Sequence, residues 1–264
     1  MLVKDEALVL RRTPFQESSL VIHFLTKNNG LLSVMARGIR KSGRKGSDRR
    51  GALAGFHTVN LESRSRSLVA MGTLTNVEIT KARRTIPSSA AALSAAQLYL
   101  EVAYRFSVAG DARPDIMHTI ETSLDLLDAG ADPLELLALS LGVLISGVGY
   151  GWQAFECAGC RGVRQLTFFS IRRGQVVCQP CGQPYTERLV PITNNILKIM
   201  QKLAWPPPFG LLCVAEQAII YRIAISSLVK AGGKMLMTDQ PFRAVVGHDL
   251  FTKEGYTPTD IRLS

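Results

Sequence analysis

Four cysteines are the residues of this chain best suited to chemistry. Cys157 and Cys160 form one Cys-x-x-Cys pair, and Cys178 and Cys181 form a second pair after seventeen intervening residues. Two such pairs at this separation can present four thiolates to one tetrahedral Zn²⁺ ion. Because four protein ligands leave no position for a water molecule, we expect one structural Zn²⁺ and not a catalytic metal.

Two other interpretations of the cysteine pairs stay open. A redox-active Cys-x-x-Cys opens a helix after a strand and does not come as such a pair of motifs, and disulfides are disfavoured in a reducing compartment. The strand-like stretches Leu166–Ile171 and Gln175–Val177 are split by Arg173-Gly174, which indicates a hairpin joining the pairs, as in a zinc ribbon. The remaining Cys213 lies in an apolar helical context, and we expect it to be buried as a small hydrophobe.

A second candidate site is the basic segment, defined as residues 37–50. It holds seven cations against one acid, interleaved with glycine and serine. We expect a flexible loop that contacts DNA phosphates, which supply affinity but little sequence recognition; a solvated loop without a partner is the alternative. The predicted DNA-binding residues are Arg37, Arg40, Lys41, Arg44, Lys45, Arg49 and Arg50. A competing basic surface in the cysteine module consists of Arg161, Arg164, Arg172 and Arg173.

No catalytic arrangement stands out in the sequence. Gly38 and Gly43 have the spacing of a nucleotide-binding loop, but Arg44 and Lys45 follow where Lys and then Ser or Thr are required. The four histidines are scattered, the acids form no cluster suited to nuclease chemistry, and no Gly-x-Ser-x-Gly elbow occurs. We therefore expect that the protein is not an enzyme.

The cysteines and cations need elements to position them, and the first 80 residues have the pattern of short strands. Turn formers separate the strands, and Asn29-Gly30 between two apolar runs is a strong hairpin signal. The expected strands are Ala7–Arg11, Leu20–Thr26, Leu31–Arg37, Phe56–Glu62 and Leu68–Ile79. Five short strands predict a small barrel of the oligonucleotide-binding (OB) type. No convincing helix signal is found between the third and fourth strands.

From Ser88 the pattern becomes helical. Predicted helices begin near Ser88-Ser89, at Pro114 and, with the clearest signal, at Asp132 as N-cap with Glu135 three residues later. Helices are also expected over 193–204 and 213–231, and little regular structure over the last thirty or so residues. The predicted fold is α+β: residues 1–80 form an OB-fold DNA-binding domain, and residues 81–264 form a helical domain with a zinc ribbon inserted at 155–188.

The charge is unevenly distributed along the chain. The formal net charge is +10; residues 1–80 hold 13 lysines and arginines against six acids, and residues 81–264 hold 18 against 15. A basic half beside a nearly neutral half favours a polyanion-binding domain joined to a part with another task. No apolar run is long enough to cross a bilayer, and the start of the chain does not have the pattern of a secretory signal. We expect a cytoplasmic, nucleoid-associated protein that does not bind membranes.

Several blocks of the sequence resemble the RecO recombination-mediator proteins of bacteria. In the first 80 residues these blocks are Glu6–Arg11, Glu17-Ser18, Leu25-Thr26 with Gly30, Ala36-Arg37-Gly38, Gly51-Ala52-Leu53 with Phe56, and Gly72-Thr73-Leu74. In the cysteine module they are Cys157 and Cys160, Phe169-Ser170, and Gly174 through Val177-Cys178 to Cys181. The blocks occur in order over most of the chain, and all four cysteines place it in the zinc-retaining subset of that family.

The resemblance implies an OB-fold, a helical domain and a zinc ribbon set into or beside the helices. It also implies that the protein binds single- and double-stranded DNA, anneals complementary strands, and helps load the RecA recombinase onto DNA coated with single-strand-binding protein. The implied partners are RecR and the acidic C-terminal tail of single-strand-binding protein. An RNA-binding protein of the translation apparatus is the alternative outside this class, because OB barrels and zinc ribbons also occur there; a nuclease or ligase is the enzymatic alternative.

Overall fold

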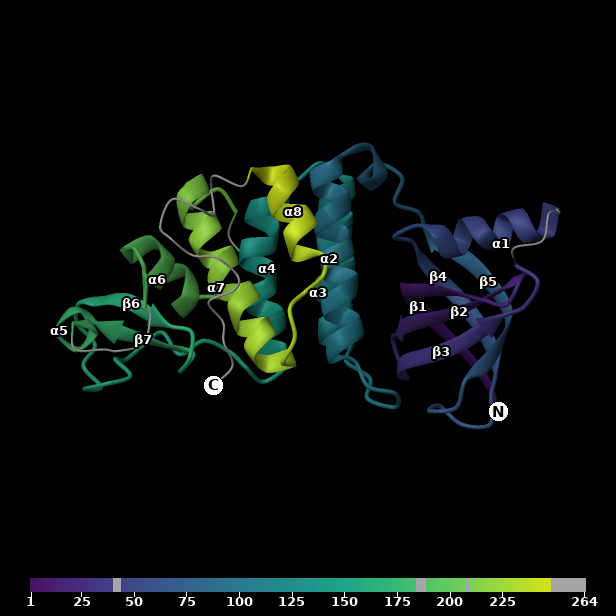
Figure 1. The fold of residues 1–264 in the computed structure, drawn as a ribbon, viewed down its shortest axis with the longest axis horizontal. Helices are drawn as coiled ribbons and strands as arrows, with labels where there is room; N and C mark the ends of the chain where they lie inside the picture. The colour runs from purple at the N-terminus through teal and green to yellow at the C-terminus, as the bar shows by residue number, and fades with distance from the viewer. Residues whose placement is uncertain (40–43, 184–188, 208, 248–264) are drawn as a thin grey trace. The chain divides into compact units, whose positions relative to one another are not determined.

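The computed structural model describes residues 1–39, 44–183, 189–207 and 209–247, and it divides into two units, Met1–Ala131 and Asp132–Ser264. The first unit begins with a barrel of five strands (Figure 1), which are β1 (Leu2–Phe15), β2 (Ser19–Thr26), β3 (Gly30–Ala36), β4 (Thr58–Arg64) and β5 (Gly72–Lys81). The barrel closes in the order β1-β2-β3-β5-β4. Neighbouring strands are antiparallel except β3 and β5, which pair in parallel. The OB-like barrel expected from the strand pattern is confirmed.

The barrel core is built from alternate residues of the strands, since successive side chains of a strand point to opposite faces. Ile22 and Phe24 of β2 and Leu32 and Val34 of β3 are completely buried in it. The hairpin predicted at Asn29-Gly30 joins these two strands: Thr26 pairs with Gly30.

Helix α1 (Arg44–Ala54) is the main departure from the predicted barrel. It lies between β3 and β4, where the sequence shows no convincing helix signal and where residues 37–50 were expected to form a flexible basic loop. The loop expectation was wrong for residues 44–50, which belong to the helix. Ala52 and Leu53 at the end of the helix belong to the barrel core and are at most 2% exposed. The sequence does not predict this helix, because Gly46 and Gly51 lower its helix propensity. Contacts with the barrel, which is formed by distant residues, compensate for that low propensity.

Two helices complete the first unit: α2 (Ala90–Phe106) and α3 (Pro114–Asp128), preceded by the short 3-10 turn η1 (Ile86–Ser88). The predicted start at Ser88-Ser89 is confirmed, since the Ser89 hydroxyl accepts a hydrogen bond from the backbone of Ala92. The predicted start at Pro114 is also confirmed. Several contacts tie these helices to the barrel, and two of them lie at Arg83 and at Gly30.

Arg83 is the first tie. Its side chain is 1% exposed and donates to the carboxylate of Asp125 on α3 at 2.8 Å and to the carbonyl of Phe56 at 2.7 Å. The second tie is the turn at Gly30, where Leu31 donates its backbone N–H to the carbonyl of Val108 at 3.1 Å. Charged groups inside a protein need such partners, so the linker between barrel and helices is held in place.

The second unit packs helices against a small sheet. Its helices are α4 (Pro133–Gly147), α5 (Gln179–Gly182), α6 (Asn194–Gln201), α7 (Val214–Gly232) and α8 (Asp239–Val246), and its strands are β6 (Leu166–Ser170), β7 (Gln175–Cys178) and β8 (Val190–Pro191), in the order β7-β6-β8. Asp132 caps α4 through the backbone N–H of Glu135, as the sequence predicted. Figure 1 shows α4 and α7 running side by side.

Two expectations for the second unit were wrong. Helix α8 lies where little regular structure was expected; it is fixed by the buried Asp239, whose carboxylate accepts a hydrogen bond from Tyr221 on α7 at 2.7 Å. Cys213 is exposed and not buried, because it is the N-cap of α7 and precedes the buried stripe of that helix. No helix among the described residues is both long and apolar enough to cross a membrane.

Candidate metal centre and nucleic-acid interface

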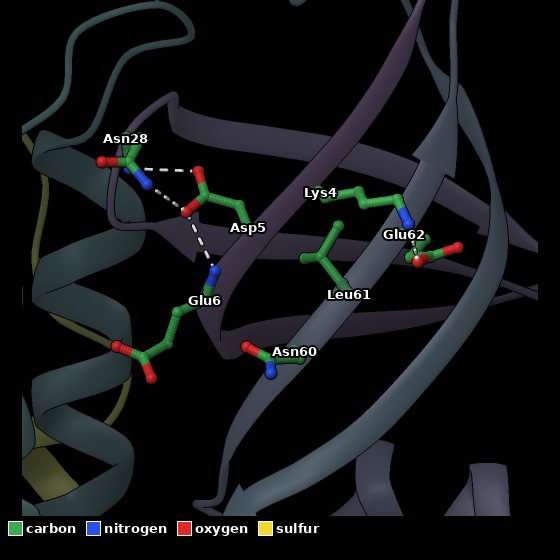
Figure 2. Close-up of a pocket in the computed structure, with 7 residues that line it drawn as sticks. All are labelled: Lys4, Asp5, Glu6, Asn28, Asn60, Leu61 and Glu62. Atoms are coloured by element: carbon green, nitrogen blue, oxygen red, sulfur yellow. Dashed lines mark hydrogen bonds and ion pairs between the residues drawn. The ribbon is translucent and has the colours of Figure 1, made fainter.

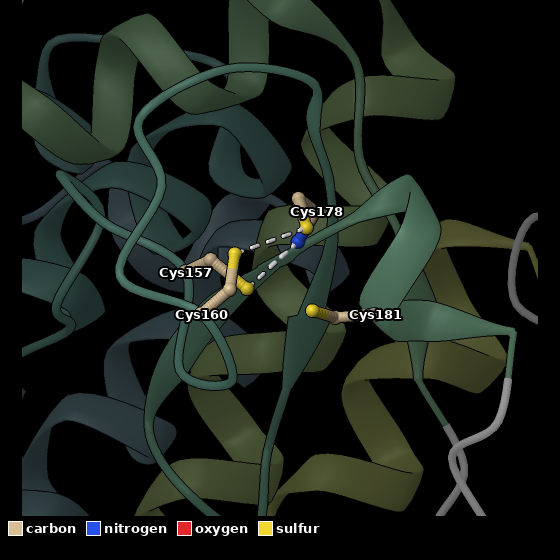
Figure 3. A group of neighbouring side chains, drawn as sticks. All are labelled: Cys157, Cys160, Cys178 and Cys181. Atoms are coloured by element: carbon tan, nitrogen blue, oxygen red, sulfur yellow. Dashed lines mark hydrogen bonds between the residues drawn. The ribbon is translucent and has the colours of Figure 1, made fainter.

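The four cysteines of the paired motifs come together in the second unit. Cys157 and Cys160 lie in a loop before β6, Cys178 ends β7, and Cys181 lies in α5. Their sulfur atoms all lie within 4.8 Å of one another (Figure 3). The expected hairpin of β6 and β7 joins the two pairs. The predicted ligand set is therefore assembled as one cluster that can hold a metal ion.

The backbone around the first cysteine pair, Cys157 and Cys160, passes close to the sulfur atoms of the cluster. A Cβ atom at Gly159 would lie 3.1 Å from the Cys181 sulfur, and one at Gly162 would lie 3.2 Å from the Cys160 sulfur. Backbone N–H groups of Gly159 and Cys178 both donate to the Cys157 sulfur at 3.3 Å. The glycines thus let the chain wrap closely around the sulfur atoms.

The thiols of the cluster differ in acidity. Burial opposes ionisation of Cys157, but backbone hydrogen bonds from Cys160, Cys178 and Gly159 outweigh it and lower the pKa of Cys157 to about 6. Hydrogen bonds with the sulfurs of Cys178 and Cys160 raise the pKa of Cys181 to about 12, and burial raises the pKa of Cys178. One thiolate forms readily, and a bound cation is needed for all four sulfurs to ionise together.

The donor set fits a structural metal ion. The sulfurs of Cys160 and Cys178 lie 3.7 Å apart, far beyond the length of about 2 Å for a disulfide bond, and all four cysteines are free thiols. Four sulfur ligands are typical of structural zinc sites, and they leave no open position for a substrate.

The predicted DNA-binding residues are placed only in part. Arg37 is exposed directly after β3, and Arg44 and Lys45 begin α1. Arg40 and Lys41 lie outside the described residues. The side chains of Arg49 and Arg50 are half-buried and donate to backbone carbonyls: Arg49 to Thr75, and Arg50 to Ile39 at 3.4 Å. These last two arginines therefore also hold α1 against the barrel.

Two exposed cations of the barrel, Arg11 and Arg12, were not singled out in the sequence interpretation. Arg11 and Arg12 lie in the distal part of β1, which continues to Phe15 and pairs there with β2 alone, since pairing with β4 ends at Leu8. The guanidinium of Arg11 lies 5.6 Å from the ring centroid of Tyr104 on α2. The sequence did offer a signal for these two cations, since Arg11 and Arg12 are adjacent basic residues within a strand-like run.

A polar pocket of about 320 Å³ in the first unit offers a contrast (Figure 2). It is lined by Lys4, Asp5, Glu6, Asn28, Asn60, Leu61 and Glu62. Asp5 accepts hydrogen bonds from the backbone and side chain of Asn28 at 3.0 and 2.8 Å, and Glu62 pairs with Lys4 at 2.5 Å. Its carboxylates are bonded within the fold and would repel phosphate, so the pocket does not suit a nucleic-acid backbone.

The fold and the cysteine cluster together define a class of protein. An OB-like barrel is followed by helices, and a hairpin inserted among those helices joins two pairs of cysteines that together can hold a metal ion.

Comparison with known families makes this assignment specific. Residues 1–83 match the family described as Recombination protein O N terminal, and residues 87–218 match Recombination protein O C terminal. The chain belongs to the RecO family of DNA repair proteins. The two family matches divide between residues 83 and 87, whereas the compact units divide after Ala131, because α2 and α3 are tied to the barrel.

Individual relatives agree with the family match. A DNA repair protein RecO of Dehalococcoides mccartyi is 28% identical over 75% of this chain and 76% of its own length. A Bacillus pumilus protein of the same name is 27% identical over 75% and 77%, and one from Myxococcus xanthus is 31% identical over 67% and 72%. These matches cover most of each relative.

Proposed function

We propose that this chain is a recombination mediator that binds single- and double-stranded DNA and anneals complementary strands. With RecR it helps load RecA onto DNA coated with single-strand-binding protein, whose acidic C-terminal tail it binds. The observation that carries this proposal is the match of barrel and helical part, in order, to the two halves of the RecO family. A protein with this task acts on the chromosome, so we place it at the nucleoid, in the cytoplasm.

For DNA binding we propose the barrel and the basic segment. Seven cations against one acid in residues 37–50 supply a strong attraction for a phosphate chain. The segment leaves the barrel at the exposed Arg37 and continues into α1, whose apolar end is anchored in the core. The proposed contacts are Arg37, Arg40, Lys41, Arg44, Lys45, Arg49 and Arg50, of which Arg49 and Arg50 have a second, structural task.

We further propose that Cys157, Cys160, Cys178 and Cys181 hold one Zn²⁺ ion. The ion would be coordinated by the four thiolates, would offset two of their four negative charges, and would hold the two ends of the β6–β7 hairpin together, which is the usual task of a four-cysteine site. The proposal includes no catalytic step, and we expect no nucleotide hydrolysis. ATP turnover that DNA stimulates, and that persists through several independent preparations, would contradict the view that the protein is not an enzyme.

The decisive experiment is strand annealing. Two complementary oligonucleotides, each carrying one dye of a fluorescence pair, are coated with single-strand-binding protein and mixed with or without this chain. We expect rapid annealing only when the chain is present. Coating with single-strand-binding protein that lacks its acidic tail is the control, and should abolish the acceleration while annealing of bare strands continues.

The alternative of an RNA-binding protein is tested by competition. Unlabelled RNA and DNA strands of matched sequence compete for the chain against one labelled DNA strand. If the chain is a DNA repair protein, both competitors should displace the labelled strand, because both offer phosphates for contact. RNA should not displace it better than DNA does. A strong preference for RNA, together with no annealing of coated DNA, would replace the proposed function by the alternative.

A further inference from the structure

The cysteine module, residues 151–183, carries more positive charge than its own acids balance. It contains four arginines and one acid. The side chains of Arg161, Arg164 and Arg172 are exposed, and no described residue forms an ion pair or a hydrogen bond with them. Other arginines of the chain, such as Arg83, pair with a carboxylate. The module therefore presents uncompensated cations to solvent, which suits a ligand that carries negative charge.

The fold gathers these arginines around the first cysteine pair. The backbone N–H of Cys157 donates to the carbonyl of Gly162 at 2.9 Å and closes a tight loop that contains Arg161. Arg161 has φ +59°, a left-handed conformation that glycine adopts more easily. The side chain of Arg173 donates to the carbonyl of Ala158 at 3.3 Å, which brings the turn between β6 and β7 to the same loop. Cations from two separate segments thus lie beside one loop.

Two exposed apolar side chains accompany the arginines. Phe155 is 65% exposed, more than any other aromatic side chain of the described residues, and Val163 is 71% exposed. The residue before Phe155 is fixed inside the fold: Ala154 is completely buried, and its carbonyl accepts a hydrogen bond from Gln201 of α6 at 2.8 Å. The single acid of the module, Glu156, follows Phe155. The fold therefore keeps an aromatic ring at the surface of a cationic module.

An exposed ring beside several cations suits a ligand that combines flat bases with a chain of phosphates. Guanidinium groups bind phosphates through charge-assisted hydrogen bonds, and an unpaired base stacks on an exposed aromatic ring. A DNA strand offers both groups, whereas an acidic protein segment offers only the charge. The residues that could contact the strand are called the module surface, and they are Phe155, Arg161, Val163, Arg164, Arg172 and Arg173.

Annealing requires that two strands of like charge come close to each other. In the proposed function the basic segment, residues 37–50, and the barrel bind one strand. A second strand needs cations of its own, because the first strand repels it and the cations of the first unit are already engaged. The module surface belongs to the other unit and supplies such cations. With one aromatic ring and few arginines it should bind the strand weakly, which favours release of the strand into the new duplex.

We propose that the module surface binds a second DNA strand while the first unit holds the first, so that one chain brings two strands together. Arg161 and Arg164 contact phosphates of the second strand, and Phe155 stacks on one of its bases. This inference rests on the proposed function in DNA binding and annealing, and it adds the residues that take up the second strand.

The test measures how one chain joins two strands that cannot anneal. Two strands that are not complementary carry the donor and the acceptor dye, and each is about ten nucleotides long, roughly the length that one OB fold covers. Energy transfer between them arises only when both are bound in one complex. We expect energy transfer with the full wild-type chain, and a complex of one chain with two strands in analytical ultracentrifugation.

The arginines are tested by a double variant. Arg161→Ala/Arg164→Ala should weaken binding of the second strand, read from the energy transfer, by about tenfold or more, and should change the affinity for the first strand by less than about twofold. Lys198→Ala/Lys202→Ala, at two exposed lysines at the end of α6 in the same unit, removes the same charge and should behave as wild type. An unchanged zinc content shows that the module of each variant stays folded.

The aromatic ring is tested by two substitutions. Phe155→Ala should weaken binding of the second strand by about fivefold or more, because one base–aromatic stack is lost. Phe155→Leu should lose nearly as much, because stacking needs the ring. Phe209→Ala, which removes another exposed ring of the second unit, should behave as wild type. The same Phe155 variants should slow the annealing of complementary strands.

Several results would overturn the second site while DNA binding itself stands. One is a wild-type chain that binds a strand but gives no energy transfer. Another is a loss of energy transfer in the arginine variant that is no larger than in the lysine variant, or an equal loss of affinity for both strands. A complex of two chains with two strands would assign the second strand to a second copy of the chain. If the wild-type chain binds no DNA, the proposed function fails, and the second site with it.

Discussion

Asp125 on α3 binds two cations that differ in how far they are removed from water. Arg83 and Lys81 lie 2.8 and 2.5 Å from its carboxylate oxygens, but the Arg83 side chain is 1% exposed and that of Lys81 is 57% exposed. Arg83 also donates to carbonyls of the barrel and of α3. Since water competes for Lys81 and not for Arg83, the two ion pairs should contribute very differently to stability.

The first prediction compares these two cations. Arg83→Ala should lower the free energy of unfolding by about 3 to 5 kcal/mol, because it leaves buried carbonyls unpaired and opens a cavity. Lys81→Ala, the matched control on the same carboxylate, should cost less than about 1 kcal/mol. Urea denaturation of both variants gives the two values. Similar small losses for both would show that Arg83 is not the tie between barrel and helices.

The second prediction concerns the metal cluster. The purified chain should contain close to one Zn²⁺, and Cys160→Ser should lose most of it, because a four-thiolate site missing one ligand loses much of its binding free energy. Cys213→Ser, at an exposed cysteine outside the cluster, should keep the full content. Elemental analysis of protein prepared without chelators is the measurement. Wild-type protein without zinc would refute the proposed cofactor.

The third prediction is a pH dependence that arises at His57. Burial, with Arg83 and Arg84 beside it, lowers the pKa of His57, against a smaller opposite effect of Asp128. Its Nδ1 accepts the backbone N–H of Arg83 at 3.0 Å, which requires a neutral ring. The unfolded chain takes up a proton as the pH falls through about 6.5, whereas the folded chain resists it. The contribution of His57 to stability is therefore complete above that pH and is lost as the pH falls below it.

The measurement is urea denaturation between pH 8 and pH 5.5. His57→Gln keeps an acceptor but does not titrate, so its free energy of unfolding should fall less steeply with decreasing pH than that of the wild type. An unchanged slope in His57→Gln would exclude His57 as its source.

At the scale of elements, the turn between β2 and β3 does more than join two strands. Gly30 has φ +67°, and a Cβ atom there would lie 2.3 Å from the carbonyl oxygen of Val108 in the loop between α2 and α3. Gly110 of that loop donates its N–H to the carbonyl of Asn29 at 2.9 Å. The hairpin signal in the sequence thus also marks the place where the barrel meets the helices.

The fourth prediction separates backbone strain from this contact. Gly38 has nearly the same φ, +65°, but a Cβ atom there meets no atom of the described residues within 4 Å. Gly38→Ala should cost about 1 kcal/mol from the left-handed backbone alone. Gly30→Ala has the same strain and a clash with rigid backbone, so it should cost at least about 2 kcal/mol more. If denaturation shows equal losses of unfolding free energy for the two variants, the Val108 carbonyl moves away from the new Cβ atom at no cost.

At the scale of the whole molecule, both units carry a cluster of cations along the chain. The basic segment belongs to the first unit. In the second unit the cysteine module around the β6–β7 hairpin has four exposed arginines, which are Arg161, Arg164, Arg172 and Arg173. No acidic residue occurs between Cys157 and Gln183. The Arg173 side chain donates to the carbonyl of Ala158 at 3.3 Å, which brings the β6–β7 turn to the first cysteine pair.

The fifth prediction assigns the larger share of binding to the basic segment. Replacing Arg40, Lys41, Arg44 and Lys45 by Ala should weaken binding to all sequences alike and make the salt dependence shallower by up to about four units. The corresponding variant of the four ribbon arginines is the matched comparison and should lose less. The placement is wrong if the segment variant keeps wild-type affinity and slope while the ribbon variant loses both.

Features that depend on neighbouring residues could be predicted from the sequence alone. The spacing of Cys157, Cys160, Cys178 and Cys181 was enough to predict their cluster, because each pair spans one tight turn and the hairpin between the pairs has its own strand pattern. The start of α4 at Asp132 and the turn at Gly30 were predictable for the same reason: an N-cap or a hairpin turn is decided within about four residues.

Features that depend on distant residues were decided only by the tertiary structure. Helix α1 exists because Ala52 and Leu53 fill the barrel core, and Arg83, which looks like an ordinary surface charge beside Arg84, is buried because Phe56 and Asp125 meet it from both sides. Which side chains of β1, β2 and β3 lie next to one another is likewise decided only when the three strands pair in register. The burial of a side chain, and which side chains it contacts, depend on residues far away in the sequence. A local sequence pattern therefore cannot predict them.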